Sequence, residues 1–437
     1  MNMDDLDRKS YDLIVIGAGA SGMSAAIAFQ KIRLLSGKEK GDVLILEKNE
    51  RVGKKVLATG NGRCNLSNKD MELSHFHSHE ADFPGRVLSG VTPSACLSFL
   101  SEIGIVTTSE GNKLFPMSKT SASVVDAFRY AMDDLDIKIA TDAAVKNIVK
   151  ENLFAVTCED GRVFSSDLLI IACGGACASY TGTTGDGYKW LSRLGHKVFA
   201  PKPSIVQLLT DNSVTKALSG LRLDCELTLT ADGNVVAEQY GEVLFTDYGL
   251  SGPAVLQVSG EVSRRMRKDR LTVPVKVSLR LFDEKTLLSI EEELMERRRT
   301  FASRPSEQFL LSILPQKIGA MLLKSALERP MSLPVSTITD GDIKKILSTM
   351  RSWNFQVLGT RSLEQAQTTI GGADCAEFSE ETLESKLVSG LFACGEVLDV
   401  DGDCGGYNLT WAFASGILAG RSAAMLLSDK AEVSDGN

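Results

Sequence analysis

Short apolar runs mark the buried strands of this chain. Four runs contain no charged residue and no alternation with polar positions: Leu13 to Ile16, Val43 to Leu46, Leu168 to Cys173 and Leu391 to Cys394. Such runs are typical of strands that are buried on both faces of a parallel sheet. Ala-rich helical patterns follow the first run and the last. The pattern predicts an α/β fold in which a Rossmann-like domain is built from both ends of the chain.

The pattern of apolar and polar positions changes after Ala200. Strand-like segments then alternate with turns, and four helical segments follow them, at Asp283 to Arg299, Ser306 to Leu314, Lys317 to Leu327 and Thr339 to Met350. We therefore predict an inserted substrate or cap domain over residues 202–355, part β-barrel-like and part helical. Residues 1–201 and 356–437 would form the two parts of the Rossmann-like domain. Within the first part, alternation between Ile137 and Val163 predicts a small antiparallel layer.

The first apolar run ends in a glycine turn that fits G-x-G-x-x-G, with Gly17, Gly19 and Gly22 as the glycines. Gly17 permits a tight turn, Gly19 lets a pyrophosphate approach the backbone, and Gly22 lets helix and strand pack closely. The helix that follows presents free N–H groups to the phosphates. Strand, turn and helix in this order predict a dinucleotide-binding unit. Ala20 and Ser21 occupy the two positions between Gly19 and Gly22 and belong to the same predicted phosphate-binding turn.

Glu47 closes the second apolar run. An acidic residue at this position is suited to hydrogen-bond the hydroxyls of an adenosine ribose. The spacing from Gly17 is longer than the usual ~20 residues, and we assign the excess to a helix end and loop over residues 31–42. The carboxylate also favours a ribose with a free 2′-hydroxyl over a 2′-phosphate.

Three further glycine-rich segments are candidates for ligand contact. Residues 53–68 combine Gly, Asn and Ser with Lys and Arg, which suits an anion or an electron-rich ring. A second turn at residues 174–187 should lie beside the same cofactor, although it lacks G-x-G-x-x-G. The third, at residues 395–409, again leads from a strand into a helix.

Composition narrows the class of protein. The net charge is −8, and the basic runs at residues 264–270 and 297–299 lack interleaved aromatic residues, so no nucleic-acid partner is expected. The nine cysteines form no C-x-x-C pair, and no Cys/His cluster has metal-ligand spacing, so no metal is expected. The acidic N-terminus is unlike a signal peptide, and no apolar stretch is long enough to span a membrane. We therefore expect a cytoplasmic protein with reduced thiols. The sequence carries no signal of oligomeric state.

Four motifs together resemble the BaiN-like (YhiN-type) flavoproteins, also labelled the aminoacetone oxidase family, which are distantly related to fumarate reductase flavoprotein subunits. The motifs are GKKVLATGNGRCNLSN from Gly53, TGTTGDG from Thr181, FTDYGLSGPA from Phe245 and GLFACGEVLDVDGDCGGYNLTWAFASG from Gly390. The resemblance covers nearly the whole chain. Two positions depart from it, because the family commonly has His where this chain has Asp247, and Gln where it has Thr410.

The resemblance implies an extended FAD. The isoalloxazine ring would lie near Asn61 to Cys64, Glu396 would hold the ribityl chain, and the segment from Gly406 to Leu409 would face the pyrimidine edge of the flavin. The full set of predicted cofactor-binding residues is Gly17, Gly19, Ala20, Ser21, Gly22, Glu47, Lys48, Lys55, Thr59, Gly60, Asn61, Gly62, Arg63, Cys64, Asn65, Gly174, Gly175, Gly395, Glu396, Gly406, Tyr407, Asn408 and Leu409.

We predict an FAD-dependent oxidoreductase, with a reductase favoured. It would pass hydride from NAD(P)H, bound transiently, through flavin N5 to an activated, enone-like C=C of a small molecule. A positioned acid must then protonate the adjacent carbon, and Tyr248, Tyr407 and Arg63 are the candidates. Cys64 could be a redox thiol, but a packed or flavin-facing thiol is favoured, because no partner cysteine is near in the sequence. Two alternatives are an oxidase that passes electrons from a small amine to O₂, and a non-catalytic or RNA-associated flavoprotein.

Overall fold

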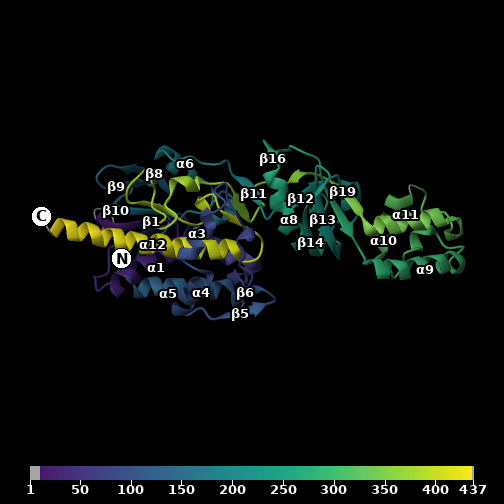
Figure 1. The fold of residues 1–437 in the computed structure, drawn as a ribbon, viewed down its shortest axis with the longest axis horizontal. Coiled ribbons are helices and arrows are strands. Elements are labelled where there is room, and N and C mark those ends of the chain that lie inside the picture. The colour runs from purple at the N-terminus through teal and green to yellow at the C-terminus, as the bar shows by residue number, and fades with distance from the viewer. Residues whose placement is uncertain (1–9, 328, 436–437) are drawn as a thin grey trace. The chain divides into compact units, whose positions relative to one another are not determined.

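The computed structural model describes residues 10–327 and 329–435, and the chain folds into two compact units (Figure 1). The first unit comprises residues 1–202 and 367–437, and the second comprises residues 203–366. The reading of the N-terminus as unlike a signal peptide rests mainly on residues 1–9, which lie outside the described residues. The predicted boundary after residue 355 falls inside a strand of the second unit, Trp353–Thr360.

The first unit is built on a seven-stranded sheet with the order β7-β2-β1-β10-β9-β8, in which β21 pairs with β10. Its strands are β1 (Ser10–Ile16), β2 (Val43–Leu46), β7 (Lys138–Ala140), β8 (Val145–Lys150), β9 (Phe154–Cys158), β10 (Val163–Ile171) and β21 (Leu391–Ala393). β1 lies parallel to both β2 and β10, and β2 lies parallel to β7. The predicted α/β class and the parallel core are confirmed.

β10 joins the two ends of the chain. Its first half, Val163 to Ser166, pairs antiparallel with β9, and its second half, Leu169 to Ile171, pairs parallel with β21 from the C-terminal part. The Rossmann-like domain is therefore built from both chain ends, as predicted. The predicted antiparallel layer is correct for β8 and β9 but wrong for Ile139, which lies in the parallel edge strand β7.

Helices α1 (Ala20–Leu35) and α12 (Tyr407–Asp435) run alongside each other in the first unit (Figure 1). Two glycines of α12 let the backbones touch. A Cβ on Gly416 would lie 2.3 Å from the carbonyl oxygen of Ser21, and one on Gly420 would lie 2.1 Å from that of Ala25. Because a real side chain cannot occupy either position, the helix pair depends on these two glycines.

Smaller elements complete the first unit. Its other helices are α2 (Lys54–Ala58), α3 (Phe83–Gly90), α4 (Pro93–Glu102), α5 (Ser121–Asp134) and α6 (Asp186–Arg193). Its short strands are β3 (Ser67–Asn68), β4 (Phe76–His77), β5 (Thr107–Glu110), β6 (Lys113–Pro116), β20 (Thr368–Ile370) and β22 (Asp401–Gly402). β4 pairs with β22, and β3, β6 and β5 form a three-stranded sheet.

A buried histidine ties the two chain segments of the first unit together. His196 follows α6, and its side chain is 0% exposed. Its Nε2 lies 3.0 Å from the Ser385 hydroxyl, and its Nδ1 lies 3.0 Å from Oε2 of Glu377. Ser385 Oγ already accepts two backbone N–H groups, so its own hydrogen points to Nε2 and the ring is neutral. Burial lowers the pKa of His196, although Glu377 opposes the shift.

The second unit contains a closed barrel with the strand order β12-β15-β14-β13-β18-β19. Its strands are β12 (Leu208–Thr210), β13 (Arg222–Ala231), β14 (Asn234–Phe245), β15 (Gly249–Ser251), β18 (Val275–Arg280) and β19 (Trp353–Thr360). Along β13 buried residues alternate with less buried ones, so one face of the strand fills the barrel. Phe245, Trp353 and Phe355 pack together within it.

Helices follow the barrel strands. α7 (Asn212–Ala217) and α8 (Pro253–Arg264) are inserted between barrel strands, and β16 (Met266–Arg267) pairs with β17 (Arg270–Leu271) in a short hairpin. Between β18 and β19 come α9 (Glu284–Thr300), α10 (Gln316–Leu327) and α11 (Asp340–Arg351). Asp283 caps α9, and Thr339 with Asp342 forms a capping box on α11. The barrel and helical parts of the insert are therefore both present, as predicted. The helix predicted from Ser306 to Leu314 is wrong, because only a short 3-10 helix, Ser306–Gln308, forms there and turns follow it.

Across the described parts of the chain, no helix combines the length and the apolar character needed to cross a bilayer.

Replacing Gly420 by alanine tests the contact between α1 and α12. The added methyl group must displace the Ala25 carbonyl, so we expect a loss of about 1–3 kcal/mol in the free energy of unfolding. Urea unfolding measures the loss. Gly90→Ala is the matched control, because its Cβ would meet only Leu418 Cδ1, at 4.0 Å. Equal stability of the two variants would contradict the close contact.

The neutral His196 makes the stability of the fold depend on pH. Its folded-state pKa lies below the unfolded value, so the unfolded chain binds the proton more readily. The stability that His196 contributes is therefore present above its unfolded pKa of about 6.5 and is lost as the pH falls below it. We expect the stability difference between the wild type and His196→Gln to shrink from pH 7.5 to pH 5 in urea unfolding. A constant difference would contradict a neutral His196.

Candidate functional site

The carboxyl ends of the parallel strands bring most of the predicted site residues together. Gly17 follows β1, Glu47 follows β2, Gly174 comes shortly after β10, and Gly395 comes shortly after β21. In open α/β sheets, ligands bind at this edge of the sheet. Segments nearly 400 residues apart in the sequence thus meet at one edge.

The glycine turn has the geometry that a bound pyrophosphate requires. Gly17 has φ of +105°, and a Cβ there would lie 2.6 Å from the Ala172 carbonyl oxygen. A Cβ on Gly22 would lie 1.9 Å from the carbonyl oxygen of Gly17, so the helix packs directly on the turn. By contrast, a Cβ on Gly19 would meet no atom within 4 Å. Gly19 therefore faces open space at the N-terminus of α1, where an anion can approach.

Glu47 is held against this turn. It is 7% exposed, and its Oε2 accepts the backbone N–H of Ala18 at 2.9 Å. Its Oε1 accepts the backbone N–H of Asn49 at 2.9 Å and the Asn49 side-chain amide at 2.7 Å. These two bonds occupy both lone pairs of Oε1, whereas Oε2 keeps a second lone pair for a ligand hydroxyl. The residue is thus fixed in position by bonds that a ribose need not displace.

The second glycine-rich turn lies beside Glu47, and its predicted place beside the cofactor stays a prediction. The Lys48 ammonium contacts Thr184 Oγ1 at 2.7 Å and Asp186 Oδ2 at 3.1 Å. The Asn49 amide donates to the Thr181 carbonyl at 3.2 Å. Asn49 and Asp186 were not among the predicted site residues. Their proximity to Glu47 arises from tertiary contacts that no local motif encodes.

Glu396 lies at a second polar centre of the same edge. Its Oε2 pairs with Lys55 Nζ at 2.5 Å, and its Oε1 accepts the backbone N–H of Thr369 at 2.7 Å. A Cβ on Gly175 would meet Thr369 Oγ1 at 2.3 Å and Glu396 Oε1 at 2.9 Å. The structure therefore brings Lys55, Gly175 and Glu396 together, and it adds Thr369, which lies in none of the glycine-rich segments.

Ser21 connects this centre to the first glycine turn. A Cβ on Gly395 would lie 2.5 Å from the Ser21 hydroxyl. The turn after β21 therefore touches the first turn of α1, and the residues predicted to hold the two halves of the cofactor are neighbours. Gly174 lies next to them, with φ of +76° and Thr183 close by.

The loop from Thr59 to Asn65 has an unusual backbone. Gly60, Asn61, Gly62 and Cys64 all have positive φ, between +54° and +81°. Positive φ is uncommon for a residue such as Cys64, and strain of this kind clusters at ligand sites. A Cβ on Gly62 would meet no atom within 4 Å. Within the described residues, Oδ1 of Asn65 is buried and accepts no hydrogen bond, so the loop offers both open space and an unused acceptor.

Arg63 and Cys64 point to different environments. The Arg63 guanidinium bonds Glu110 at 2.5 Å and lies 4.5 Å from the centre of the Phe115 ring. Cys64 is completely buried, and burial raises the pKa of its thiol to about 11. A protonated, buried thiol is a poor nucleophile. The geometry favours the packed thiol over the redox thiol, the two readings that the sequence left open.

The N-terminus of α12 packs on the end of the same loop. A Cβ on Gly406 would lie 2.5 Å from the Ser67 carbonyl oxygen, and Thr410 Oγ1 bonds Ser67 Oγ at 2.9 Å. Tyr407 is 3% exposed, and burial, with Asp70 and Asp403 nearby, raises its pKa to about 12. The Asn408 side chain bonds backbone groups of Gly402 and Asp403, while Leu409 is half-buried. Asn408 thus braces the turn that precedes the helix.

Tyr248 lies in the second unit, in the turn between β14 and β15. The Arg361 guanidinium lies 4.5 Å from the centre of its ring. The neighbouring Asp247, where the family commonly has His, is exposed.

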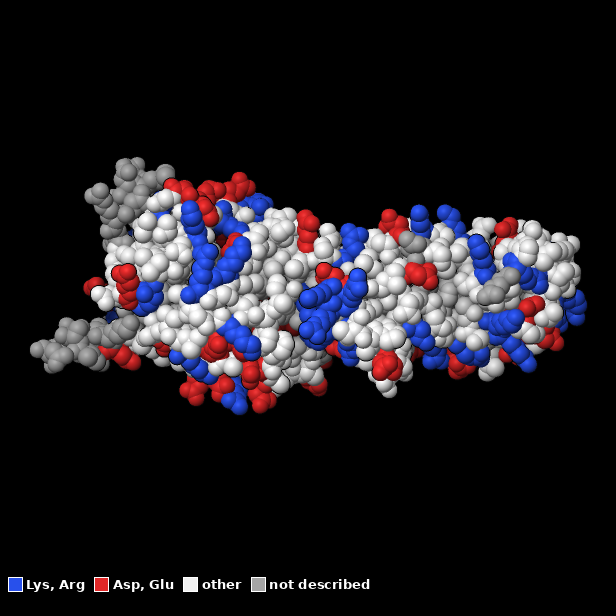
Figure 2. Space-filling model, turned by 90° about the horizontal axis from the view of Figure 1, so that it is seen from above, with Lys and Arg blue, Asp and Glu red and all other residues white. Residues whose placement is uncertain are grey.

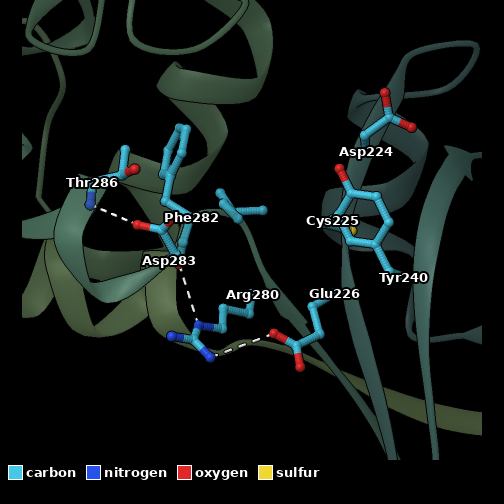
Figure 3. Close-up of a pocket in the computed structure, with 9 residues that line it drawn as sticks. Asp224, Cys225, Glu226, Tyr240, Arg280, Phe282, Asp283 and Thr286 are labelled. Atoms are coloured by element: carbon cyan, nitrogen blue, oxygen red, sulfur yellow. Dashed lines mark hydrogen bonds and ion pairs between the residues drawn. The ribbon is translucent and has the colours of Figure 1, made fainter.

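The second unit also has a polar pocket of about 310 Å³ between β13, β14 and the start of α9 (Figure 3). Arg280 lies 3.4 Å from Glu226, and Asp283 Oδ1 accepts the Thr286 N–H at 2.7 Å. Asp283 caps α9 through this bond. Glu226 and Arg280 thus pair with each other across the pocket, and Asp283 is occupied by the helix cap.

A histidine cluster in the first unit escaped the sequence analysis. His75 and His77 both bond Asp403, each at 2.9 Å, and His75 also stacks on Tyr407. The signal was present as H-x-H-x-H at residues 75–79, since alternate residues of an extended segment share one face. Over the described ranges, three or more His, Cys, Asp or Glu side chains do not come together in a metal-binding arrangement.

These features define a dinucleotide-binding protein of the Rossmann class. The open space at Gly19 and Gly62, the fixed Glu47 carboxylate and the unused acceptor on Asn65 fit an extended FAD along the strand ends. Comparison with known proteins gives the family. Residues 11–422 match the model described as HI0933-like protein Rossmann domain, and the chain belongs to this family.

Two curated relatives and one solved structure are similar to the chain. A 3-dehydro-bile acid delta(4,6)-reductase from Clostridium scindens is 33% identical over 94% of this chain and 98% of its own length. A ribosomal RNA dihydrouridine synthase from Haemophilus influenzae is 29% identical over 92% of this chain and 96% of its own. A flavocytochrome c3 fumarate reductase has 15% identity and a TM-score of 0.48, covering 96% of this chain and 79% of that chain.

The predicted family resemblance is thereby confirmed, and the chain is an FAD-dependent oxidoreductase.

The buried Cys64 gives a direct test of the loop. Because its pKa is about 11, we expect native protein at pH 8 to leave Cys64 unmodified by iodoacetamide over a time that labels a model thiol completely. Peptide mass spectrometry reads the modification, and the urea-unfolded chain, with all nine thiols accessible, is the control. Rapid native labelling at Cys64 would show a reactive thiol instead.

Proposed function

We propose that the chain is a reductase that takes hydride from NAD(P)H and adds it, through FAD, to a C=C conjugated with a carbonyl group in a small molecule. The whole-length relative named a delta(4,6)-reductase carries the proposal. A second relative is named for making dihydrouridine, and dihydrouridine is likewise the product of adding hydrogen across a C=C next to a carbonyl. Two different substrates thus undergo the same type of reaction in proteins similar to this one.

The proposed cofactor contacts follow the strand edge. The turn from Gly17 to Gly22 would hold the pyrophosphate, and Glu47, with Lys48, would hold the adenosine half. Glu396 would bond the ribityl hydroxyls, with Lys55, Gly174, Gly175 and Gly395 around it. The loop from Thr59 to Asn65 and the segment from Gly406 to Leu409 would enclose the flavin ring. When bound, FAD supplies two-electron hydride transfer at its N5 position.

The residues of this chain must supply the proton. Reduction of a C=C needs one hydride and one proton, and the acid has to remain protonated until the transfer. Tyr407 fits this requirement, because its raised pKa keeps the phenol neutral across the physiological range. Tyr248 is the second candidate. Arg63 already bonds Glu110, so we assign it an orienting role and not proton donation.

The electron donor would bind only transiently. The sequence has one G-x-G-x-x-G, and FAD is proposed to occupy it, so NAD(P)H would need another surface.

Neither relative's printed name favours the oxidase alternative. The expectations of a cytoplasmic protein and of no nucleic-acid partner stay predictions.

A pyrimidine base of RNA is a second candidate substrate. The relative named a ribosomal RNA dihydrouridine synthase motivates it. The exposed Arg267, Lys268 and Arg270 of the β16–β17 hairpin supply positive charge, and Lys and Arg side chains gather in patches in Figure 2. Such charge attracts phosphate in a salt-dependent way. The net charge of −8 opposes it.

One experiment separates these candidates. The purified protein should show the absorption spectrum of a bound flavin, and anaerobic NADH or NADPH should bleach it. Reoxidation is then followed with a steroid enone, with uridine-containing RNA and with O₂. Fastest reoxidation by the enone supports the proposal. Fastest reoxidation by RNA, lost in high salt, supports the second candidate. A protein that neither carries nor accepts FAD would refute both.

Tyr407→Phe separates proton donation from hydride transfer. We expect it to slow reoxidation by the enone by about 10²–10⁴-fold, the usual contribution of a positioned acid. Reduction of the flavin by NAD(P)H should not change, since that step needs no phenol. Stopped-flow absorbance resolves the two half-reactions. Tyr248→Phe is the matched comparison, and an effect confined to it would transfer the proposed role to Tyr248.

A further inference from the structure

Three of the four histidines lie on one short segment, and each pairs with a carboxylate from a segment more than 300 residues away. His75 and His77 bond Asp403, and His79 bonds Asp399 at 2.8 Å. Pairing of β4 with β22, with His77 opposite Asp401, holds the two backbones in register. The imidazole–carboxylate contacts therefore link the segment after β3 to the turn before α12.

The geometry around His75 requires a charged ring. Its Nδ1 lies 2.9 Å from Asp403 Oδ2, and its Nε2 lies 3.3 Å from Asp70 Oδ2. A neutral imidazole carries only one N–H, so one nitrogen would then present a lone pair to a carboxylate. Only the imidazolium can donate to both. Because its ring centre lies 4.3 Å from that of Tyr407 at 21°, the charge also lies over an aromatic face.

This cluster borders the proposed flavin site. The Asn68 side-chain amide donates to the Gly405 carbonyl at 2.9 Å, and Gly406 packs on Ser67. The Asp403 backbone N–H donates to the His75 carbonyl at 3.0 Å. Residues 67–77 and 401–410 thus form one packed piece that includes Tyr407 and the N-terminus of α12.

The groups around the cluster are mainly acidic. His75 faces Asp70 and Asp403, and Tyr407 experiences Asp70, Asp403 and Glu72. Asp403 also faces His77, and the half-buried Cys404 stays protonated because burial raises its pKa. Lys113 is the cation that acts on this cluster, through Cys404. A protonated His75 supplies the positive charge that its two carboxylate partners face directly.

We propose that His75, paired with Asp403 and Asp70, is a positioning residue that holds Tyr407 and the N-terminus of α12 in place only while protonated, so that the hold on FAD weakens as the pH rises. The inference rests on the proposed FAD site, and it adds a pH-dependent control of cofactor retention. Protonation is the driving step, and no bond other than N–H is made or broken.

The direction of the pH dependence follows from the charges around His75. Burial lowers the pKa of His75, but hydrogen bonds to Asp403 and Asp70 outweigh this effect and leave the pKa raised. The pairing is therefore complete below the ordinary histidine pKa and is lost as the pH rises through the raised value. The Gly17 turn, which would hold the phosphates at the other end of FAD, has no part in this cluster.

Dissociation of FAD from the holoenzyme tests the proposal. After dilution, free FAD is detected by its fluorescence, at pH 6 and at pH 8.5. We expect about tenfold faster release at pH 8.5, the change that corresponds to one pKa unit of coupling. His75→Asn keeps a donor toward Asp403 but carries no charge, so its release rate should be nearly independent of pH.

Two further variants complete the design. His79→Asn is the matched control, because His79 also pairs with a carboxylate but stacks on Phe199 and not on Tyr407. It should keep the wild-type pH dependence. Asp70→Asn removes only the half-exposed second carboxylate, so it should fold even if His75→Asn does not, and it should shift the pH midpoint of release downward.

The outcomes are distinct. Flat release in the wild type, or pH dependence that persists in His75→Asn and is unshifted in Asp70→Asn, would overturn the proposal. Loss of the pH dependence in His79→Asn would also overturn it. A protein that binds no FAD at any pH would refute the proposed cofactor as well, whereas tight but pH-independent binding would refute this inference alone.

Discussion

The contact between the backbones of α1 and α12 is the constraint on which the first unit depends. Gly416 and Gly420 bring the last helix of the chain onto Ser21 and Ala25 of the first. Once that contact is made, the turn after β21 lies against Ser21 and the N-terminus of α12 lies against Ser67. One close approach between two helices therefore positions two of the three segments that form the candidate site.

The site itself is organised by pairs of opposite charge that join distant segments. The pairs are Lys55 in α2 with Glu396, Lys48 with Asp186 at the start of α6, and Arg63 with Glu110 at the end of β5. Exposed ion pairs contribute little to stability. Their main effect here is to define where each loop lies, which leaves the open faces of Gly19 and Gly62 free for a ligand.

Patterns within short stretches of sequence predicted those parts of the fold that depend only on neighbouring residues. The apolar runs became the parallel core, and the glycine spacing identified Gly17, Gly19 and Gly22 with the packing roles that the structure shows. Thr369 and Asn49 could not be predicted, because their contacts depend on which loops meet in three dimensions. The edge strand β7 was misassigned since alternation alone does not reveal the direction of pairing.

The histidine segment was missed for a different reason. Its H-x-H-x-H spacing lacks the pattern of a metal site, and the carboxylates that pair with it lie more than 300 residues away in the sequence. The Ser385–His196–Glu377 contact was equally invisible, because its members lie 181 and 189 residues from the histidine. Both cases show that a titratable side chain acquires its chemistry from neighbours that only the folded chain supplies.

The closed barrel makes the second unit an exchangeable module. Its first and last strands, β12 and β19, are hydrogen-bonded neighbours, and the Arg361 N–H donates to the Gln207 carbonyl at 2.9 Å. The chain therefore enters and leaves the insert at adjacent points, the arrangement under which domain insertion is tolerated. During evolution, such a unit can be replaced or reshaped while the sheet of the first unit remains intact. One FAD-binding domain can then be adapted to different electron acceptors.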